Sequence, residues 1–399
     1  METSEPTFSA NEEEGEKPAS QSRRPPAPEV SASRRGFLKA LGAGVLIAGA
    51  GLGGVAINDG ERILGETLNR KKEEAALAKA RERLRNEFGV EVDFSPLQPL
   101  EKEEEWLSGE SVEHLVEKRR VCEALIDAFA IYPPVIYKKE SYISIVRVMD
   151  DLKLITDGTP ENIHGLAEAE GVLHLRHIEK DGVLPISRRG FFGQVGRKNL
   201  DKAGFIGTFH HELFHDLDDI GNEEWVANTR GVSPQMSTGA LVYMYREELD
   251  KLANNNTITK SEKDAALKEL QGFAYDDGKE NPEEDRATIA ELLLSAPEEL
   301  GAPERMDQVL SKKISFIKKF CFQKSRGIMD EGYWETIRHA KGNSEIVARY
   351  HKERAEALAR LSLDELRADV EKETGERLDD EKLKSWREDI LLGVSDAAK

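Results

Sequence analysis

The stretch Phe205–His215 constrains the fold of this chain more than any other part of its sequence. It reads F-I-G-T-F-H-H-E-L-F-H and places His211 and His215 four residues apart. On an α-helix, residues four apart lie on one face, about 6 Å from each other along the axis. The opposite face of the same helix is apolar and carries Phe209, Leu213 and Leu217. The spacing therefore predicts a helix that is anchored in a core by its apolar side and presents both histidines to a cleft.

The pattern H-E-x-x-H within this stretch points to a metal site. Two imidazoles on one helix face can bind one tetrahedral zinc ion. Glu212 lies beside the first histidine and can take a proton from a zinc-bound water as a general base. Zinc lowers the pKa of that water to about 7, so hydroxide is available at neutral pH. The sequence predicts one catalytic zinc ion, with His211 and His215 as ligands and Glu212 as the base.

Local spacing leaves the third protein ligand open. A metzincin would carry a glycine and a third histidine where this chain has Asp218 and Gly221, so that class is excluded. Asp219 is close enough in sequence to be an alternative ligand. Glu223 and Glu224, on the following loop, are further alternatives. The remaining source is a glutamate from a later helix.

The segment 281–291 is such a helix by its sequence, because Pro282 suits the first helical position and acids follow in the first turn. Its pattern x-E-D-x-A-x-x-x-A, combined with the earlier H-E-x-x-H, resembles the bacterial zinc-binding gluzincin metallopeptidases. These are relatives of the catalytic domain of anthrax lethal factor. The resemblance implies a zincin-like fold and Glu284 as the third zinc ligand.

The resemblance extends over about residues 100–345. It implies Tyr275, within G-F-A-Y, as a stabiliser of the oxyanion. It also covers Trp225 with Asn228, the stretch 327–330 and the pair Tyr333-Trp334. Four residues after Glu284, where such families usually carry an acid that orients a zinc histidine, this chain has Thr288.

These features predict an exported zinc metallopeptidase, which hydrolyses peptide bonds of a peptide or protein substrate with a zinc-activated water. A protein of a different class remains open, namely a catalytically silent zincin-like protein that binds a partner or a component of the cell envelope. Glu212 separates the two, because a silent descendant often loses its base before its ligands. This chain retains the base.

The N-terminal region has the pattern of an export signal. Residues 1–33 are rich in Glu, Ser and Pro and are expected to be disordered. They lead into S-R-R-G-F-L-K, which contains Arg34 and Arg35, and then into an uncharged run over 40–57. The motif, its location near the N-terminus and the uncharged segment after it are together typical of a twin-arginine signal over 34–57. The twin-arginine translocase is therefore an expected partner.

The location of the mature chain depends on what happens to this signal. Signal peptidase could cleave near Ala56, since the stretch Gly54-Val55-Ala56 contains the small residues that this enzyme accepts. Without cleavage the segment is an anchor and provides the expected membrane contact. A similar arginine motif at 187–192 is internal and has no apolar segment after it, so the motif alone does not indicate an export signal. The expected location is the periplasm, the medium or the outer side of the cytoplasmic membrane.

The fold class expected is α+β and helix-rich, with a short sheet beside the active-site helix. Strands are predicted at 135–137, 141–149 and 172–178, and the chain from 204 onward is almost wholly helical by its pattern. Ser111 and Ser362 are expected to begin helices. The domains predicted after the signal are a helical linker at 58–99, the catalytic domain at 100–345 and a charged helical tail at 346–399.

Charge and cysteine content exclude other classes of protein. With 57 Lys+Arg against 76 Asp+Glu, the net charge is −19, which argues against a nucleic-acid partner. The 2 cysteines, Cys122 and Cys321, exclude a disulfide framework and a four-cysteine zinc site. Cys321 lies on an apolar helix face together with Ile314 and Ile317, so a buried thiol is expected there.

The other histidines singled out by the sequence are expected to have structural roles. His210 points away from the ligand face and is expected to support the ligands or to lie on the surface. His174 and His177 alternate on a predicted strand, and His339 is expected on a helix surface.

Overall fold

The computed structural model describes residues 53–95, 111–149, 153–156, 159–168, 171–177, 200–230, 238–300 and 307–396. The chain divides into two compact units, Met1–Ile63 and Leu64–Lys399, and nearly all described residues belong to the second. The expected disordered region at 1–33 and the twin-arginine signal, apart from residues 53–57, lie outside the described residues. None of the helices in the described part is long and apolar enough to cross a membrane.

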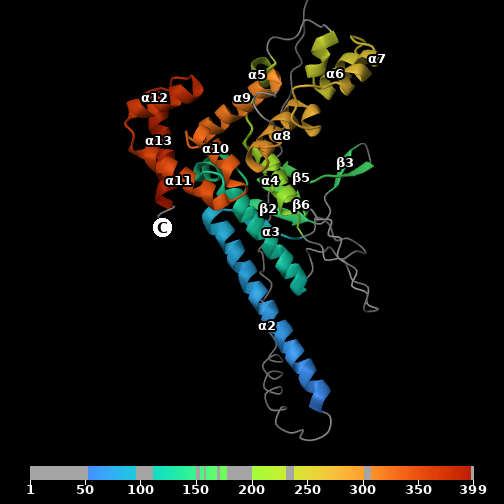
Figure 1. Cartoon of the computed structure of the whole chain (residues 1–399), viewed down its shortest axis with the longest axis vertical. Helices are drawn as coiled ribbons and strands as arrows, with labels where there is room; N and C mark the ends of the chain where they lie inside the picture. Colours follow the sequence, from blue (N-terminus) through green and yellow to red (C-terminus); the bar gives the residue numbers. More distant parts are fainter. Residues whose placement is uncertain are drawn as a thin grey trace, which may run out of the picture. The chain divides into compact units, whose positions relative to one another are not determined.

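The protein is helix-rich and α+β, with a small mixed sheet, as the sequence predicts (Figure 1). The α-helices are α2 (Gly53–Arg83), α3 (Val112–Ala130), α4 (Lys202–Leu217), α5 (Asn222–Thr229), α6 (Arg246–Asn254), α7 (Lys260–Lys268), α8 (Pro282–Ser295), α9 (Gln308–Lys324), α10 (Glu331–Ala340), α11 (Ser344–Arg360), α12 (Leu363–Thr374) and α13 (Asp380–Asp396). Short π-helices span Leu84–Phe88 and Ile136–Glu140, and short 3₁₀-helices span Thr238–Tyr243 and Asp277–Lys279.

The main sheet has the strand order β1-β2-β6-β5. Its strands are β1 (Glu91–Asp93), β2 (Ile145–Met149), β5 (Gly165–Glu168) and β6 (Val172–Arg176). The first three strands in this order run parallel, and β5 pairs antiparallel with β6. Of the described strands only β6 pairs with β5, so β5 forms an edge of the sheet. A separate antiparallel ribbon joins β3 (Lys153–Thr156) to β4 (Thr159–Asn162).

Several helix boundaries follow the signals in the sequence. Ser111 caps α3, and its side chain accepts a hydrogen bond from the backbone N–H of His114. Ser362 forms a capping box with Glu365 at the start of α12. Pro282 lies in the first turn of α8, where its missing N–H costs nothing.

The strand predicted at 135–137 is wrong. Val135 is helical and a π-helix begins at Ile136, and both side chains are buried. Pro134 suits a helix start, and burial against the core overrides the strand propensity of β-branched residues. The strand expected at 141–149 forms only over Ile145–Met149, and the one expected at 172–178 ends at Arg176.

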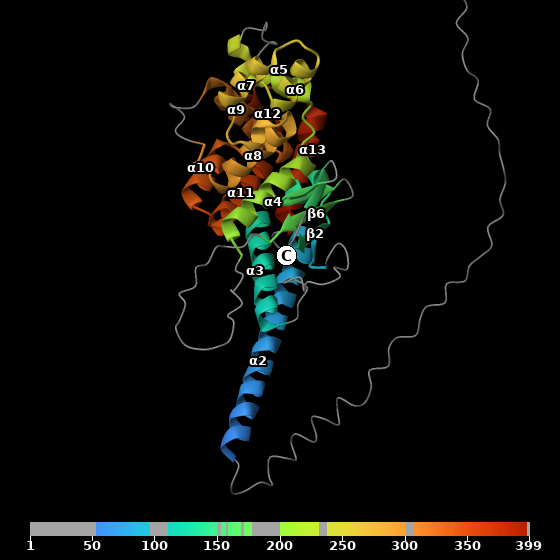
Figure 2. The same ribbon diagram turned by 90° about the vertical axis from the view of Figure 1, so that its right-hand side faces the viewer.

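One hydrophobic core extends from α2 to α13. The helical linker expected at 58–99 does not stand apart from the catalytic domain, because Leu77 and Leu84 pack into this core. The helices expected as a separate tail at 346–399 share the same core through Leu358, Leu383 and Ile390. Figure 2 shows the same helices after a quarter turn. Most described helices therefore bury their apolar side chains in this one core, and a smaller separate cluster around α6 and α7 contains Leu241, Leu249, Ile258 and Ala266.

Helix α4 lies at the centre of this core, where it packs on α3, α8 and the edge strand β5 (Figure 1). Its predicted apolar face is buried, and the rings of Phe209 and Phe129 meet edge to face with centroids 4.7 Å apart. Cys321 is buried as expected, and burial raises the pKa of its thiol to about 12. The packing fixes α4 and leaves its other face for polar side chains.

Candidate metal centre

His211 and His215 lie on the polar face of α4, one turn apart, and both side chains are partly buried. Their Nε2 atoms are 3.2 Å apart. The apolar face of the helix is buried in the core, which fixes the backbone positions of both histidines on the opposite face. The local prediction for these two residues therefore matches the geometry of the folded chain.

Glu284 comes to the histidines from the first turn of α8. Its backbone N–H donates to the side chain of Asn281, the N-cap residue, at 2.9 Å. Ala287 and Ala290, on the same helix, are buried and small, which allows α8 to lie close to α4. The carboxylate then extends across the gap between the two helices toward both rings.

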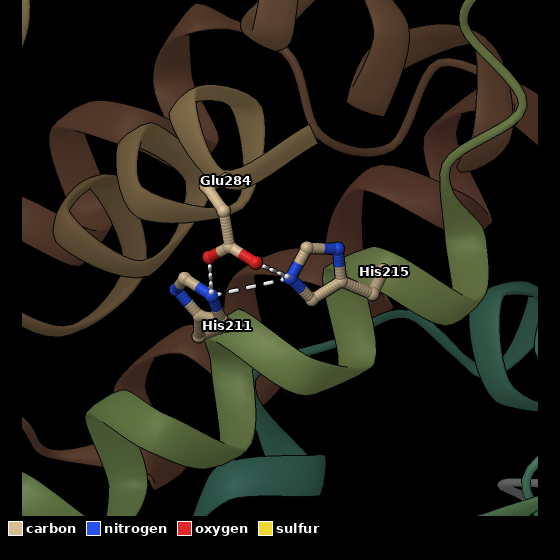
Figure 3. A group of neighbouring side chains, drawn as sticks. All are labelled: His211, His215 and Glu284. Carbon is tan, nitrogen blue, oxygen red and sulfur yellow. Dashed lines mark hydrogen bonds and ion pairs between the residues drawn. The ribbon is translucent and has the colours of Figure 1, made fainter. Parts of the chain in front are cut away.

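The carboxylate and the two imidazoles form a compact cluster (Figure 3). His211 Nε2 lies 3.0 Å from Glu284 Oε2, and His215 Nε2 lies 3.6 Å from Glu284 Oε1. Ligands about 2.0–2.1 Å from one tetrahedral zinc ion are about 3.3 Å apart. The three separations scatter around that value, so the donor atoms fit one ion without rearrangement of the helices.

The nearer acids considered as third ligands do not join this cluster. Among the described residues, the group of possible ligands around the histidines contains Glu284 alone. Asp219 is exposed and pairs with Lys324 at 2.9 Å, and Glu223 and Glu224 lie in the first turn of α5. The role of Glu284 as a metal ligand stays a prediction, but among the described acids only Glu284 joins the two histidines in the group of possible ligands.

The carboxylates around the two histidines favour a positive charge within the cluster. Burial by itself lowers the pKa of His211, but hydrogen bonds to Glu284 and Glu291 outweigh it and raise the pKa to about 10. Burial would raise the pKa of Glu284, yet the two histidines hold it well below its usual range. A carboxylate that stays ionised beside two imidazole nitrogens is a suitable environment for a divalent cation.

Glu212 lies between the cluster and the edge strand. It is only 8% exposed, and burial raises the pKa of its carboxyl although the nearby histidines oppose the shift. The backbone N–H of Ala167 on β5 donates to this carboxylate. A Cβ atom at Gly165 would lie 2.4 Å from Glu212 Cγ, so the glycine makes room for the base. A buried carboxylate of raised pKa, beside a metal site, is suited to proton transfer.

Glu291 is a site residue that the sequence reasoning missed. Its Oε2 lies 3.2 Å from His211 Nδ1, the ring nitrogen that faces away from the cluster. Thr288 occupies the position at which the similar families usually carry an orienting acid. Its buried hydroxyl has no hydrogen-bond partner in the described structure. A Cβ atom at Gly207 would lie 2.8 Å from Glu291 Oε1, so this glycine lets the carboxylate pass over α4. Two features of the sequence could have indicated Glu291. It lies seven residues after Glu284 and so on the same face of the helix, and Gly207 lies one turn before His211.

Glu291→Ala is expected to weaken zinc binding by about 10–100-fold, because an outer carboxylate fixes the tautomer and the orientation of a ligating histidine. Glu291→Gln keeps an acceptor for Nδ1–H and is expected to lose less. Competition with a chelator of known affinity measures both. Glu388→Ala, at an exposed acid of α13, is the control. Unchanged affinity in Glu291→Ala would contradict the orienting role.

Tyr275 is 51% exposed, and its hydroxyl donates to Glu299 Oε2 at 2.8 Å. The hydrogen bond to Glu299 and the negative charge of that residue raise the pKa of the phenol, and the charge of Glu291 adds a smaller effect. The side chain therefore lies on the Glu291 side of the site and bonds to another acid. Among the described residues, no hydrogen bond joins Tyr275 to His211, His215 or Glu284.

The remaining histidines lie outside the cluster. His210 is buried and not at the surface; its Nδ1 lies 3.0 Å from the Tyr132 hydroxyl, and burial lowers its pKa to about 3. His177 is hydrogen-bonded to the buried Glu117 at 3.0 Å. His174 is buried on β6, with Nε2 3.1 Å from Glu168 Oε1 but without hydrogen-bond geometry. His339 is exposed on α10.

Comparisons with known proteins give little beyond this geometry. No family model matches the sequence, and no curated protein matches it. A solved structure of a "putative zinc-binding metallo-peptidase" from Bacteroides caccae is similar, with 12% sequence identity and a TM-score of 0.36. The similarity covers 71% of this chain and 95% of the other. A TM-score of this size does not establish a shared fold.

Proposed function

We propose that the protein is a zinc-dependent metallopeptidase. The observation that carries the proposal is the convergence of two imidazole nitrogens and one carboxylate, with separations of 3.0–3.6 Å, beside the buried Glu212. Two histidines and one glutamate are a donor set of catalytic zinc sites, which keep a further position for water or substrate. Zinc held there by His211, His215 and Glu284 would polarise a carbonyl group and lower the pKa of water.

Glu212 is the proposed carrier of the proton. Its carboxylate takes a proton from the attacking water and returns it to the nitrogen of the leaving amine. The raised pKa of the buried carboxyl supports this role, because a stronger base accepts a proton more readily at neutral pH. The hydrogen bond from Ala167 holds the carboxylate on the side of the cluster that faces β5.

The edge strand β5 supports a peptide as the substrate. In the described sheet no strand pairs with its outer side. The backbone N–H of Ala167 already donates to Glu212, and the other outward backbone groups of the strand are in position to pair with an extended chain. Gly165 and Ala167, which contact Glu212, belong to this strand. A peptide that added to the edge would therefore pass the base and the metal cluster.

Tyr275 is the proposed hydrogen-bond donor to the oxyanion. This role requires its hydroxyl to break the hydrogen bond to Glu299. Tyr275→Phe removes the hydroxyl and is expected to lower kcat more than it raises KM, because the bond would form in the transition state. Steady-state kinetics with a cleaved peptide measure both constants. An unchanged kcat would remove Tyr275 from the mechanism.

Metal content and turnover test the proposed function together. The purified chain is expected to hold about one zinc ion and to cleave members of a peptide mixture, with cleavage lost to a chelator and restored by zinc. Elemental analysis and mass spectrometry of the peptides provide the measurements. Zinc without cleavage of any peptide would favour the silent, partner-binding alternative, and a chain without zinc would contradict the proposal.

We further propose export through the twin-arginine translocase, and replacement of the arginine pair tests it. Arg34→Lys with Arg35→Lys keeps the charge but is expected to leave the chain in the cytoplasm, because the pathway recognises the paired arginines. Cell fractionation and immunoblotting measure the location. Arg188→Lys with Arg189→Lys, in the similar internal motif at 187–192, is the matched control. Normal export of the first variant would indicate a simple anchor.

A further inference from the structure

The two residues that follow Glu284 are charged, yet both are buried. Asp285 is 0% exposed and Arg286 is 2% exposed. Their partners are also buried, since the side chain of Lys313 is 1% exposed and that of Asp218 is 5% exposed. A buried charge is costly unless it is paired, and a well-packed apolar pair often stabilises a fold as well as an ion pair does. Stability alone therefore does not explain two adjacent buried ion pairs.

The first pair ties α8 to the end of α4. Arg286 Nε lies 2.6 Å from Asp218 Oδ2, and Arg286 Nη1 donates to Asn222 Oδ1 at 2.9 Å. Asp218 is the C-cap residue of α4, three positions after His215. The pair therefore sets the distance between the turn that carries Glu284 and the turn that carries His215.

The second pair ties the same turn of α8 to a different group of helices. Asp285 Oδ2 lies 2.7 Å from Lys313 Nζ of α9, and it accepts hydrogen bonds from Tyr245 at 2.8 Å and from Trp225 at 3.3 Å. Lys313 also donates to the backbone carbonyl of Gly272 at 2.7 Å. One carboxylate thus connects α8 with α5, α6 and α9.

Successive residues of a helix project about 100° apart, so Glu284, Asp285 and Arg286 point in three directions. Two ion pairs on two of these directions restrict both the rotation of α8 about its axis and its shift along that axis. Glu284 points in the third direction, toward the two histidines. A metal ligand must keep its distance from the ion to within about 0.2 Å. We propose that Asp285–Lys313 and Asp218–Arg286 are positioning pairs, which hold Glu284 at the correct height and angle for the metal.

This inference rests on the proposed metal site, and metal binding by the folded full chain tests it. One variant combines Asp285→Asn with Lys313→Gln, and another combines Asp218→Asn with Arg286→Gln; both keep hydrogen-bonding groups and remove the charges. Arg354→Gln with Asp369→Asn is the matched control, because it removes a partly buried ion pair between α11 and α12. Glu284→Gln is the reference for loss of the third ligand. Zinc affinity comes from competition with a chelator, at a temperature at which circular dichroism shows each variant folded.

Removal of either ion pair is expected to weaken zinc binding by about 10–100-fold. The control variant is expected to bind zinc as tightly as the wild type does. Cobalt provides a spectroscopic readout, since a shift to higher coordination number weakens its visible bands in the site variants and in Glu284→Gln. Arg286→Lys, which keeps the charge, is expected to retain more affinity than the neutral double variant, and it replaces that variant if the latter does not fold. Wild-type affinity and cobalt bands in both site variants, whatever their melting temperatures, would overturn the positioning role. A wild-type chain that binds neither metal would overturn the proposed metal site and this inference together.

Discussion

Glu212→Gln is expected to keep zinc and to lose peptide hydrolysis by about 10³-fold or more. General acid–base catalysis contributes about 10²–10⁴-fold, and the amide of Gln cannot accept the proton of the attacking water. The substitution preserves the size of the side chain, and the amide oxygen can still accept the hydrogen bond from Ala167. Because Glu212 is not one of the three clustered ligands, the zinc content is expected to stay at the wild-type value. Elemental analysis and kcat on one cleaved peptide measure the two quantities.

Asp216→Asn is the matched control for this result. Asp216 lies one turn further along the same face of α4, its carboxylate accepts the backbone N–H of Tyr142 at 3.1 Å, and burial raises its pKa as it does for Glu212. Loss of a hydrogen-bonded acid of raised pKa from α4 is thus common to both variants, whereas only Glu212 lies beside the cluster. Activity of the same order as wild type is expected for Asp216→Asn. Cleavage by Glu212→Gln at the wild-type rate would contradict the proposed mechanism.

His211→Ala combined with His215→Ala is expected to abolish zinc binding and, with it, turnover. The double substitution removes two of the three ligand side chains, and a single carboxylate does not hold zinc in a protein at ordinary concentrations. Zinc at 1,000 times its Kd stabilises a folded chain that binds it by about 4 kcal/mol. Zinc is therefore expected to raise the melting temperature of the wild type and to leave that of the double variant unchanged.

Differential scanning calorimetry with and without zinc, together with elemental analysis, measures this effect. His339→Ala is the control, because this histidine is exposed on α10 and lies outside the cluster. The control variant is expected to hold zinc and to show the wild-type shift in melting temperature. A double variant that retained stoichiometric zinc would place the metal elsewhere in the chain.

The secondary structure could be predicted where local chemistry decides it. Ser111, Pro282 and Ser362 mark helix starts through their own side chains, and the structure confirms all three. The interpretation of 135–137 as a strand failed because Val135 and Ile136 are buried in the core, and burial outweighs local propensity. The sharing of one core by α11–α13 was equally invisible, since a charged helix with a narrow apolar stripe does not reveal which surface covers that stripe.

The sequence by itself determined the arrangement of His211, Glu212 and His215, because a helix of 3.6 residues per turn sets which side chains share a face. Only the tertiary structure brings Glu284 to the cluster, since this residue is 73 positions from His211 and local spacing left Asp219 open as an alternative. The same holds for Glu291, which is 80 residues from His211. Contacts of this kind depend on how α8 packs against α4 and on small residues such as Gly207 that permit the approach. The periodicity of one helix cannot specify the position of another, because that position follows from the packing of the whole core.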